Sequence, residues 1–224
     1  MDDQGRLGAA ARETMIPAPV SPDPLPRFGD RRRTRVGILG GSFNPAHAGH
    51  LHVAQLARNR LQLDQVWLLV SPGNVLKPQA GMAPFKQRLA WARGISDGRR
   101  IVATGIEEAL RTRLSVDTIK ELQRRFPRVT FVWVIGADIL AQLPQWHRWS
   151  EFAARVPLLV VPRPSFTYRA LAGKAAQRLR STRLPFRAAT KLASARAPAW
   201  LVLMAPQNAL SASALRAARK GGVS

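Results

Sequence analysis

The chain has 224 residues, 46% of them hydrophobic, which is enough to bury one substantial core, so we expect a single main domain. It contains no cysteine, which excludes disulfides and thiolate chemistry. No apolar run approaches the roughly 20 residues of a membrane-spanning helix, and no secretory signal is apparent. These features predict a soluble protein of the cytoplasm.

The formal net charge of +22 is carried mostly by arginines, which are spread from Arg6 to Arg219. Such a charge is compatible with nucleic-acid binding. The sequence has no RNA-binding aromatic motif and no contiguous basic stripe, and abundant alanine and proline favour compositional bias as the source. We therefore do not expect a nucleic-acid partner, although the charge would attract polyanionic nucleotides.

The first 34 residues hold five prolines between Pro17 and Pro26 and show little periodicity. This composition predicts a disordered tail over residues 1–34, followed by one domain over residues 35–224.

The first element of that domain is a strand–turn–helix unit. An apolar run over residues 36–39 ends at Gly40 and Gly41, and a helical pattern of apolar residues follows His50. Glycines let the backbone turn sharply and approach a ligand closely, and the start of a helix attracts negative charge. With Ser42 and the imidazoles of His47 and His50 nearby, the unit suits phosphoryl or nucleotidyl transfer.

The histidines have two alternative roles. Histidines at a helix start are most often surface residues. Metal ligation is a second alternative, because His47, His50 and His52 are close in sequence. However, His50 and His52 are two positions apart and do not share a helix face, and the chain has neither cysteine nor an H-E-x-x-H pattern. We therefore expect phosphate binding and no metal ligands supplied by the protein.

Residues 40–50 resemble the signature G-G-[ST]-F-[DN]-P-x-H-x-G-H of bacterial nicotinate-nucleotide adenylyltransferases, which belong to the nucleotidyltransferases with an H-x-G-H motif. The resemblance implies that His47 and His50 donate hydrogen bonds, or positive charge, to the α-phosphoryl oxygens of ATP. It also implies that the turn positions the phosphates through Gly40, Gly41, Ser42 and Phe43.

A second strand is predicted over residues 66–70, ended by a Ser-Pro-Gly turn. The loop after it carries Lys77, and it resembles the loop that follows this strand in the family. Lys77 is therefore a candidate phosphate contact, with an ordinary surface lysine as the alternative. A helix is predicted from Pro84 to Ile95, with Arg88 on its polar side.

A short strand over residues 101–103 precedes a helix that runs to Arg125, for which Ser115 is a plausible N-cap. The family carries S-Y-T-x-D-T-L here. Ser115, Asp117 and Thr118 match its T, D and T, and the resemblance implies that this segment holds the nicotinate ring. Arg113 and Leu114 depart from the S-Y of the pattern.

The β-branched and aromatic run over residues 130–135 predicts a buried strand, which ends at Gly136-Ala137-Asp138. Asp138 matches a family carboxylate that contacts the nucleotide; its alternative role is to cap the next helix. Trp146 matches the family tryptophan that stacks on the pyridine ring, with core packing as the alternative.

Another buried strand over residues 156–161 is followed by Arg163, which is placed to meet an anion of the mononucleotide. Residues 169–196 are predicted to be helical in part, and a last strand covers residues 200–204. Residues 210–216 resemble the I-S-[SA]-[ST]-x-[IL]-R motif of the family, which implies that Ser213 and Arg216 grip the triphosphate.

This alternation of strands and helices predicts an α/β protein with a doubly wound, mostly parallel Rossmann-like sheet and helices on both faces. The candidate residues would converge at the carboxyl edge of that sheet. The implied reaction joins nicotinate mononucleotide and ATP to give nicotinate adenine dinucleotide and pyrophosphate, with Mg²⁺ on the triphosphate.

Other phosphate monoesters remain alternative substrates, namely nicotinamide mononucleotide and phosphopantetheine. His47 argues against phosphopantetheine, whose enzymes read T-x-G-H. A basic nucleic-acid-binding protein is the alternative from a different class. The sequence leaves the oligomeric state open, and a homo-oligomer is compatible with it.

Overall fold

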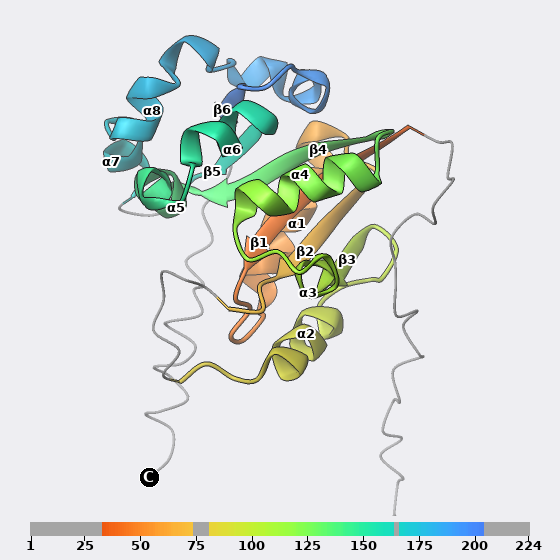
Figure 1. Cartoon of the computed structure of the whole chain (residues 1–224). Coiled ribbons are helices and arrows are strands. Elements are labelled where there is room, and N and C mark those ends of the chain that lie inside the picture. The colour runs from red at the N-terminus through yellow and green to blue at the C-terminus, as the bar shows by residue number, and fades with distance from the viewer. Residues whose placement is uncertain (1–32, 74–80, 164–165, 204–224) are drawn as a thin grey trace, which may run out of the picture.

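A computed structural model describes residues 33–73, 81–163 and 166–203. Within these residues the chain forms one six-stranded sheet, in which every neighbouring pair is parallel and the strand order is β3-β2-β1-β4-β5-β6 (Figure 1). The predicted doubly wound α/β fold is confirmed. The strands are β1 (Thr34–Gly41), β2 (Gln65–Val70), β3 (Ile101–Thr104), β4 (Val129–Gly136), β5 (Leu158–Val161) and β6 (Trp200–Val202).

The helices follow the strands in alternation, as the sequence predicts. They are α1 (Ala48–Leu61), α2 (Phe85–Gly94), α3 (Ile106–Leu110), α4 (Ser115–Arg125), α5 (Ala137–Gln142), α6 (Trp149–Arg155), α7 (Thr167–Leu171) and α8 (Lys174–Arg178), with 3-10 turns η1 (Leu143–Gln145), η2 (Arg180–Thr182) and η3 (Phe186–Ser194). In the described part of the chain, no helix is long and apolar enough to cross a membrane.

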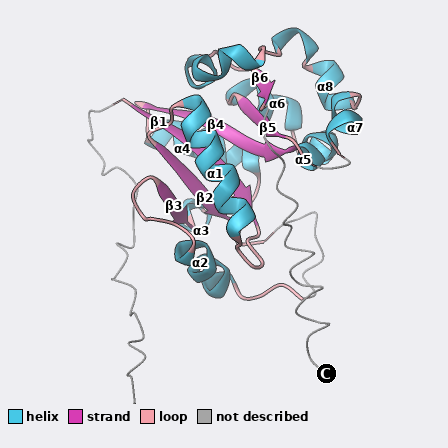
Figure 2. Cartoon of the chain, turned by 180° about the vertical axis from the view of Figure 1, so that it is seen from behind, coloured by secondary structure: helices cyan, strands magenta, loops and turns pink. Residues whose placement is uncertain are grey.

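Helices cover both faces of the sheet. Figure 1 shows α4 and α6 in front of it, and the opposite view in Figure 2 shows α1 in front. Two clusters of buried side chains match these layers: one packs α4, α5 and α6 against one face, and the other packs α1, α2 and η3 against the opposite face. Because side chains alternate along a strand, each central strand contributes to both clusters and is apolar along most of its length.

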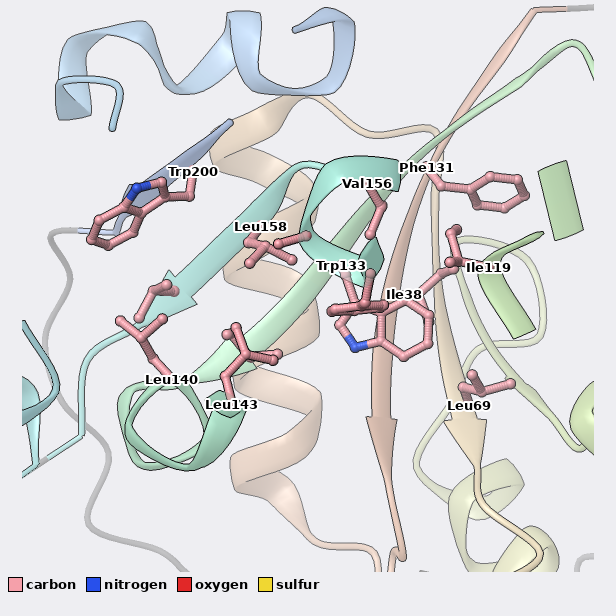
Figure 3. Close-up of a cluster of buried hydrophobic side chains, with 14 of the residues drawn as sticks. Ile38, Leu69, Ile119, Phe131, Trp133, Leu140, Leu143, Val156, Leu158 and Trp200 are labelled. Carbon is pink, nitrogen blue, oxygen red and sulfur yellow. The ribbon is translucent and has the colours of Figure 1, made fainter. Parts of the chain in front are cut away.

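The first cluster is centred on aromatic side chains of the middle strands (Figure 3). Ile38 of β1 is fully buried and is paired in register with Trp67 of β2 and Trp133 of β4. The ring of Trp133 meets Phe152 of α6 edge-on, with 5.0 Å between the ring centroids. This packing fixes β1, on which the glycine turn depends, against its neighbours on both sides.

The order of the strands reverses between β1 and β4. The chain runs outward from β1 to β2 and β3, then returns to place β4 on the other side of β1. Ligands of open parallel sheets bind at such a point, beyond the carboxyl ends of the strands. The histidine turn (residues 42–47) follows β1, Asp138 follows β4 and Arg163 follows β5, so the fold brings these groups to one edge.

Two details differ from the expectations. Arg88 was expected on the polar side of its helix, but its side chain is only 1% exposed, so that prediction was wrong. Helix α4 begins at Ser115 with Leu114 as its N-cap residue, so the alternative role of Ser115 as the N-cap was also wrong. The predicted tail lies outside the described residues, apart from Arg33 and Thr34, and the division of the chain into tail and domain stays a prediction.

Replacing Ile38 with alanine is expected to lower the free energy of unfolding by about 2–5 kcal/mol, because it leaves a cavity between two buried tryptophans. Chemical denaturation followed by tryptophan fluorescence measures the change. The exposed Lys120→Ala on α4 is the control and should change stability by no more than about 0.5 kcal/mol. A loss below about 1 kcal/mol for Ile38→Ala would show that this part of the core repacks easily.

Candidate active site

The two histidines hold the start of helix α1. His47 is the N-cap residue in extended conformation, and its Nδ1 accepts the backbone N–H of Gly49 at 3.1 Å. In return, Nδ1 of His50 accepts the backbone N–H of His47 at 3.3 Å. An imidazole nitrogen that accepts a hydrogen bond carries no proton, so each neutral ring carries its proton on Nε2. The rings are neighbours, with centroids 3.9 Å apart.

Phe43 supports this pair from the turn that follows β1. Its side chain is 1% exposed, and its ring lies 4.8 Å from that of His50, centroid to centroid. The backbone of Phe43 has φ +48°, an uncommon conformation for a residue other than glycine. A Cβ on Gly41 would lie 3.3 Å from the Phe43 ring, so a larger residue would press on the support of His50.

The environment of His47 favours its neutral form. Burial lowers the pKa of His47, and the nearby positive charge of Arg163 lowers it further. At neutral pH the ring is therefore uncharged, and through Nε2–H it acts as a hydrogen-bond donor.

Asp138 and Arg163 form an ion pair beside the histidines. Arg163 Nε lies 3.2 Å from Asp138 Oδ1, a buried atom for which no geometrically acceptable hydrogen bond is found among the described residues. A Cβ on Gly136 would collide with Oδ1 and would lie 2.9 Å from Arg163 Nε. The glycine therefore leaves the room that the pair needs. In the sequence analysis Asp138 is expected to contact ATP and Arg163 to contact the mononucleotide. The structure brings the two side chains together.

The segment predicted to hold nicotinate is built around interior hydrogen bonds. Thr118 is fully buried, and its hydroxyl lies 2.9 Å from both Glu107 Oε1 and Thr112 Oγ1. Burial raises the pKa of Glu107 to about 7, against a smaller lowering by the Thr118 hydrogen bond. The Thr118 side chain thus anchors the start of α4 from inside, and a ligand would meet the backbone or its neighbours.

Closer to solvent, Asp117 is paired with Arg148, a residue the sequence analysis missed. Arg148 donates a 2.6 Å hydrogen bond to Asp117 Oδ1 and also contacts Glu151 at 3.3 Å. Ser115 is half-buried in the first turn of α4. The pair joins α4 to the beginning of α6.

Trp146 is half-buried at the end of η1 and packs against Phe152, with ring centroids 5.5 Å apart. Phe152 in turn packs against Trp133, and a Cβ on Gly40 would lie 3.5 Å from the Trp133 ring. A continuous series of aromatic contacts therefore runs from Trp146 to the glycine turn.

Arg88 is the second residue that the sequence analysis missed. It is buried and donates hydrogen bonds to four backbone carbonyls around the histidine turn. The helix periodicity held a signal, because Arg88 follows Phe85 by three positions and precedes Ala92 by four, which places it on an apolar stripe.

Three predicted contacts, Lys77, Ser213 and Arg216, lie outside the described residues. Within the ranges that are described, no group of three or more histidine, aspartate or glutamate side chains is arranged to hold a metal ion.

Arg163→Gln is expected to raise the pKa of His47, because it removes the repulsion by a positive charge while the burial remains. In the wild type the folded chain binds this proton less readily than the unfolded chain, so this residue lowers stability as the pH falls below about 6.5. NMR titration of the imidazole signals measures the pKa. Arg169→Gln on the exposed part of α7 is the control, and an unchanged His47 midpoint in Arg163→Gln would contradict the assigned repulsion.

Comparison with known proteins agrees with this architecture. The cytidylyltransferase-like family matches residues 38–218. A probable nicotinate-nucleotide adenylyltransferase of Gluconobacter oxydans is 58% identical over 81% of this chain and 93% of its own length. One of Gluconacetobacter diazotrophicus is 53% identical over 85% of this chain and 88% of its own length.

Among solved structures, Plasmodium falciparum nicotinic acid mononucleotide adenylyltransferase complexed with NaAD aligns with a TM-score of 0.60 over 82% of this chain and 83% of that one. At 17% sequence identity, this likeness concerns the fold alone. The sequence relatives are far closer and cover most of both chains. On these matches, the chain belongs to the cytidylyltransferase-like family and, within it, to the nicotinate-nucleotide adenylyltransferases.

Proposed function

We propose that this protein joins nicotinate mononucleotide and ATP to give nicotinate adenine dinucleotide and pyrophosphate. The observation that carries the proposal is the pair of adjacent imidazoles at the start of α1, in which Nδ1 of each ring accepts a backbone N–H, at the switch point of a parallel sheet. Family membership supports the same reaction.

The reaction needs no general base. The phosphate of the mononucleotide is ionised at neutral pH, and it attacks the α-phosphorus of ATP in line as pyrophosphate leaves. Such transfers depend mainly on positioning and on stabilising the charge of the transferred group. We assign His47 and His50 to this task, with Nε2–H of each ring donating to the α-phosphoryl oxygens. The lowered pKa of His47 suits a neutral donor.

The glycine turn would position the triphosphate. Gly40 and Gly41 let the backbone approach the phosphates, and Ser42 can add a hydroxyl donor. The sequence motifs assign the remaining triphosphate contacts to Lys77, Ser213 and Arg216.

The nucleotide substrate would bind as its Mg²⁺ complex, since Mg²⁺ binds phosphate oxygens together with one or two carboxylates. The buried Asp138 Oδ1, which lacks a hydrogen bond within the described residues, fits the role of such a carboxylate. The ion would neutralise charge on the triphosphate.

The mononucleotide would lie on the other side of the switch point. Trp146 is half-buried, and the accessible part of its side chain would stack on the pyridine, while the first turn of α4 at Ser115 would offer backbone N–H groups to the carboxylate. Asp117 would act through its pair with Arg148. Arg163 would attract the phosphate of the mononucleotide or its carboxylate.

The proposed function is tested by measuring pyrophosphate release from ATP with three phosphate monoesters. Nicotinate mononucleotide should be the preferred substrate over nicotinamide mononucleotide and phosphopantetheine. Preference for either of the others would overturn the substrate assignment, and no release with any of them would overturn the reaction.

His50→Ala is expected to lower kcat by roughly 10² to 10³, the usual cost of losing one donor to a transition-state oxyanion. Steady-state kinetics at saturating substrates measures the loss, and circular dichroism checks that helix α1 persists. His52→Ala, two residues further along the same helix, is the matched control and should turn over normally. Near-normal turnover by His50→Ala would contradict a catalytic role for this histidine.

Trp146→Ala is expected to raise KM for nicotinate mononucleotide by roughly 10-fold, because base stacking on an aromatic ring contributes about 1–3 kcal/mol in other nucleotide sites. KM for ATP should change little. Equal increases for both substrates would show that Trp146 serves the packing against Phe152 rather than the pyridine.

A further inference from the structure

Arg88 has an unusual environment for a charged side chain. It is 1% exposed, and its donors reach four backbone carbonyls: Nε to Ala83 at 2.9 Å, one terminal nitrogen to Ser42 at 2.7 Å and Ser71 at 2.8 Å, and the other to Pro72 at 3.0 Å. No ion pair to a carboxylate is found for it in the described parts of the chain. The charge of the guanidinium is therefore stabilised by carbonyl dipoles rather than by a carboxylate.

These acceptors belong to three separate pieces of chain. Ser42 lies in the histidine turn, Ser71 and Pro72 follow β2 directly, and Ala83 stands just before α2. The Arg88 side chain thus links the turn that carries His47 to the end of the neighbouring strand β2 through hydrogen bonds.

Two further contacts make the same connection. The backbone N–H of Ser71 donates to the carbonyl of Gly41 at 3.0 Å. The Asn44 side chain donates to the carbonyl of Gly81 at 3.1 Å and accepts the N–H of Ala83 at 3.2 Å. Arg88 forms hydrogen bonds with all three pieces of chain.

Arginine suits this position for two physical reasons. Its planar guanidinium offers five N–H donors in a fixed arrangement, which the ammonium group of lysine cannot reproduce. Burial lowers the pKa of Arg88, yet an arginine stays protonated near neutral pH. A fixed positive charge therefore lies directly behind the Ser42 backbone, where its field is weakly screened by water.

We propose that Arg88 is a positioning residue of the active site, which holds the histidine turn in register with the end of β2 and adds positive potential behind the turn. It acts through the backbone of Ser42 and does not touch substrate. The effect on turnover rests on the proposed function, whereas the effect on the geometry of the turn does not.

The experiment compares Arg88→Lys, which keeps the charge but loses the planar set of donors, with Arg88→Met, which loses both. Arg93→Met is the matched control, an arginine on the same helix outside this network. Two properties are measured on each folded variant: the ring signals of the four histidines by NMR without ligand, and kcat and KM for each substrate.

The proposal predicts shifted or broadened signals of His47 and His50 in both Arg88 variants, while the signal of His147, which lies between η1 and α6, stays fixed. It also predicts a fall in kcat of roughly 10- to 100-fold in Arg88→Met, as expected for a misplaced catalytic group, with a smaller fall in Arg88→Lys. KM for nicotinate mononucleotide should change by less than twofold in each.

The proposal is overturned if folded Arg88→Met keeps the wild-type histidine signals and a kcat within twofold of the wild type. If Arg88→Met does not fold, the same result for folded Arg88→Lys overturns it. A lower melting temperature without these changes would show that Arg88 contributes only to the stability of the fold. If the wild type itself releases no pyrophosphate, the proposed function fails, and the histidine signals decide the positioning role by themselves.

Discussion

Two backbone N–H groups at the start of α1 have imidazole nitrogens as their acceptors, and the geometry of the site follows from this. Nδ1 of His47 accepts the backbone N–H of Gly49, Nδ1 of His50 accepts the backbone N–H of His47, and these two hydrogen bonds orient both rings with Nε2 left to carry the proton of each neutral ring. Phe43 supports one ring, and the charge of Arg163 acts on the other. The turn therefore presents two donors whose directions are set before any ligand arrives.

The sheet supplies the second constraint. Because β1 pairs with both β2 and β4, the turn after β1 lies between two halves of the fold. Arg88 fastens it to the β2 side, while Asp138 and Arg163 approach from the β4 and β5 side. An arginine thus lies on each side of the histidines, and Arg163 has Asp138 as its ion-pair partner.

Local patterning was sufficient to predict the strands, the alternation with helices and the parallel sheet, because buried parallel strands are apolar throughout and the connecting helices are amphipathic. The motif around His47 and His50 predicted a site at the turn after β1, where the structure places the two rings side by side; their catalytic role stays a prediction. Contacts between distant segments could not be read in this way. The pairing of Asp138 with Arg163 depends on how far β5 extends beside β4. The backbone carbonyls that accept hydrogen bonds from Arg88 belong to three segments that meet only after folding.

The dual use of the histidines has an evolutionary consequence. Active sites commonly trade stability for activity, so that mutations which weaken catalysis often strengthen the fold. Here His47 and His50, which are proposed to take part in the reaction, also cap the N-terminus of α1, the longest helix in the described part of the chain. Losing either histidine would remove a capping hydrogen bond along with the donor proposed for that ring, so the needs of a stable protein and of an active one would favour the same residues at the start of α1.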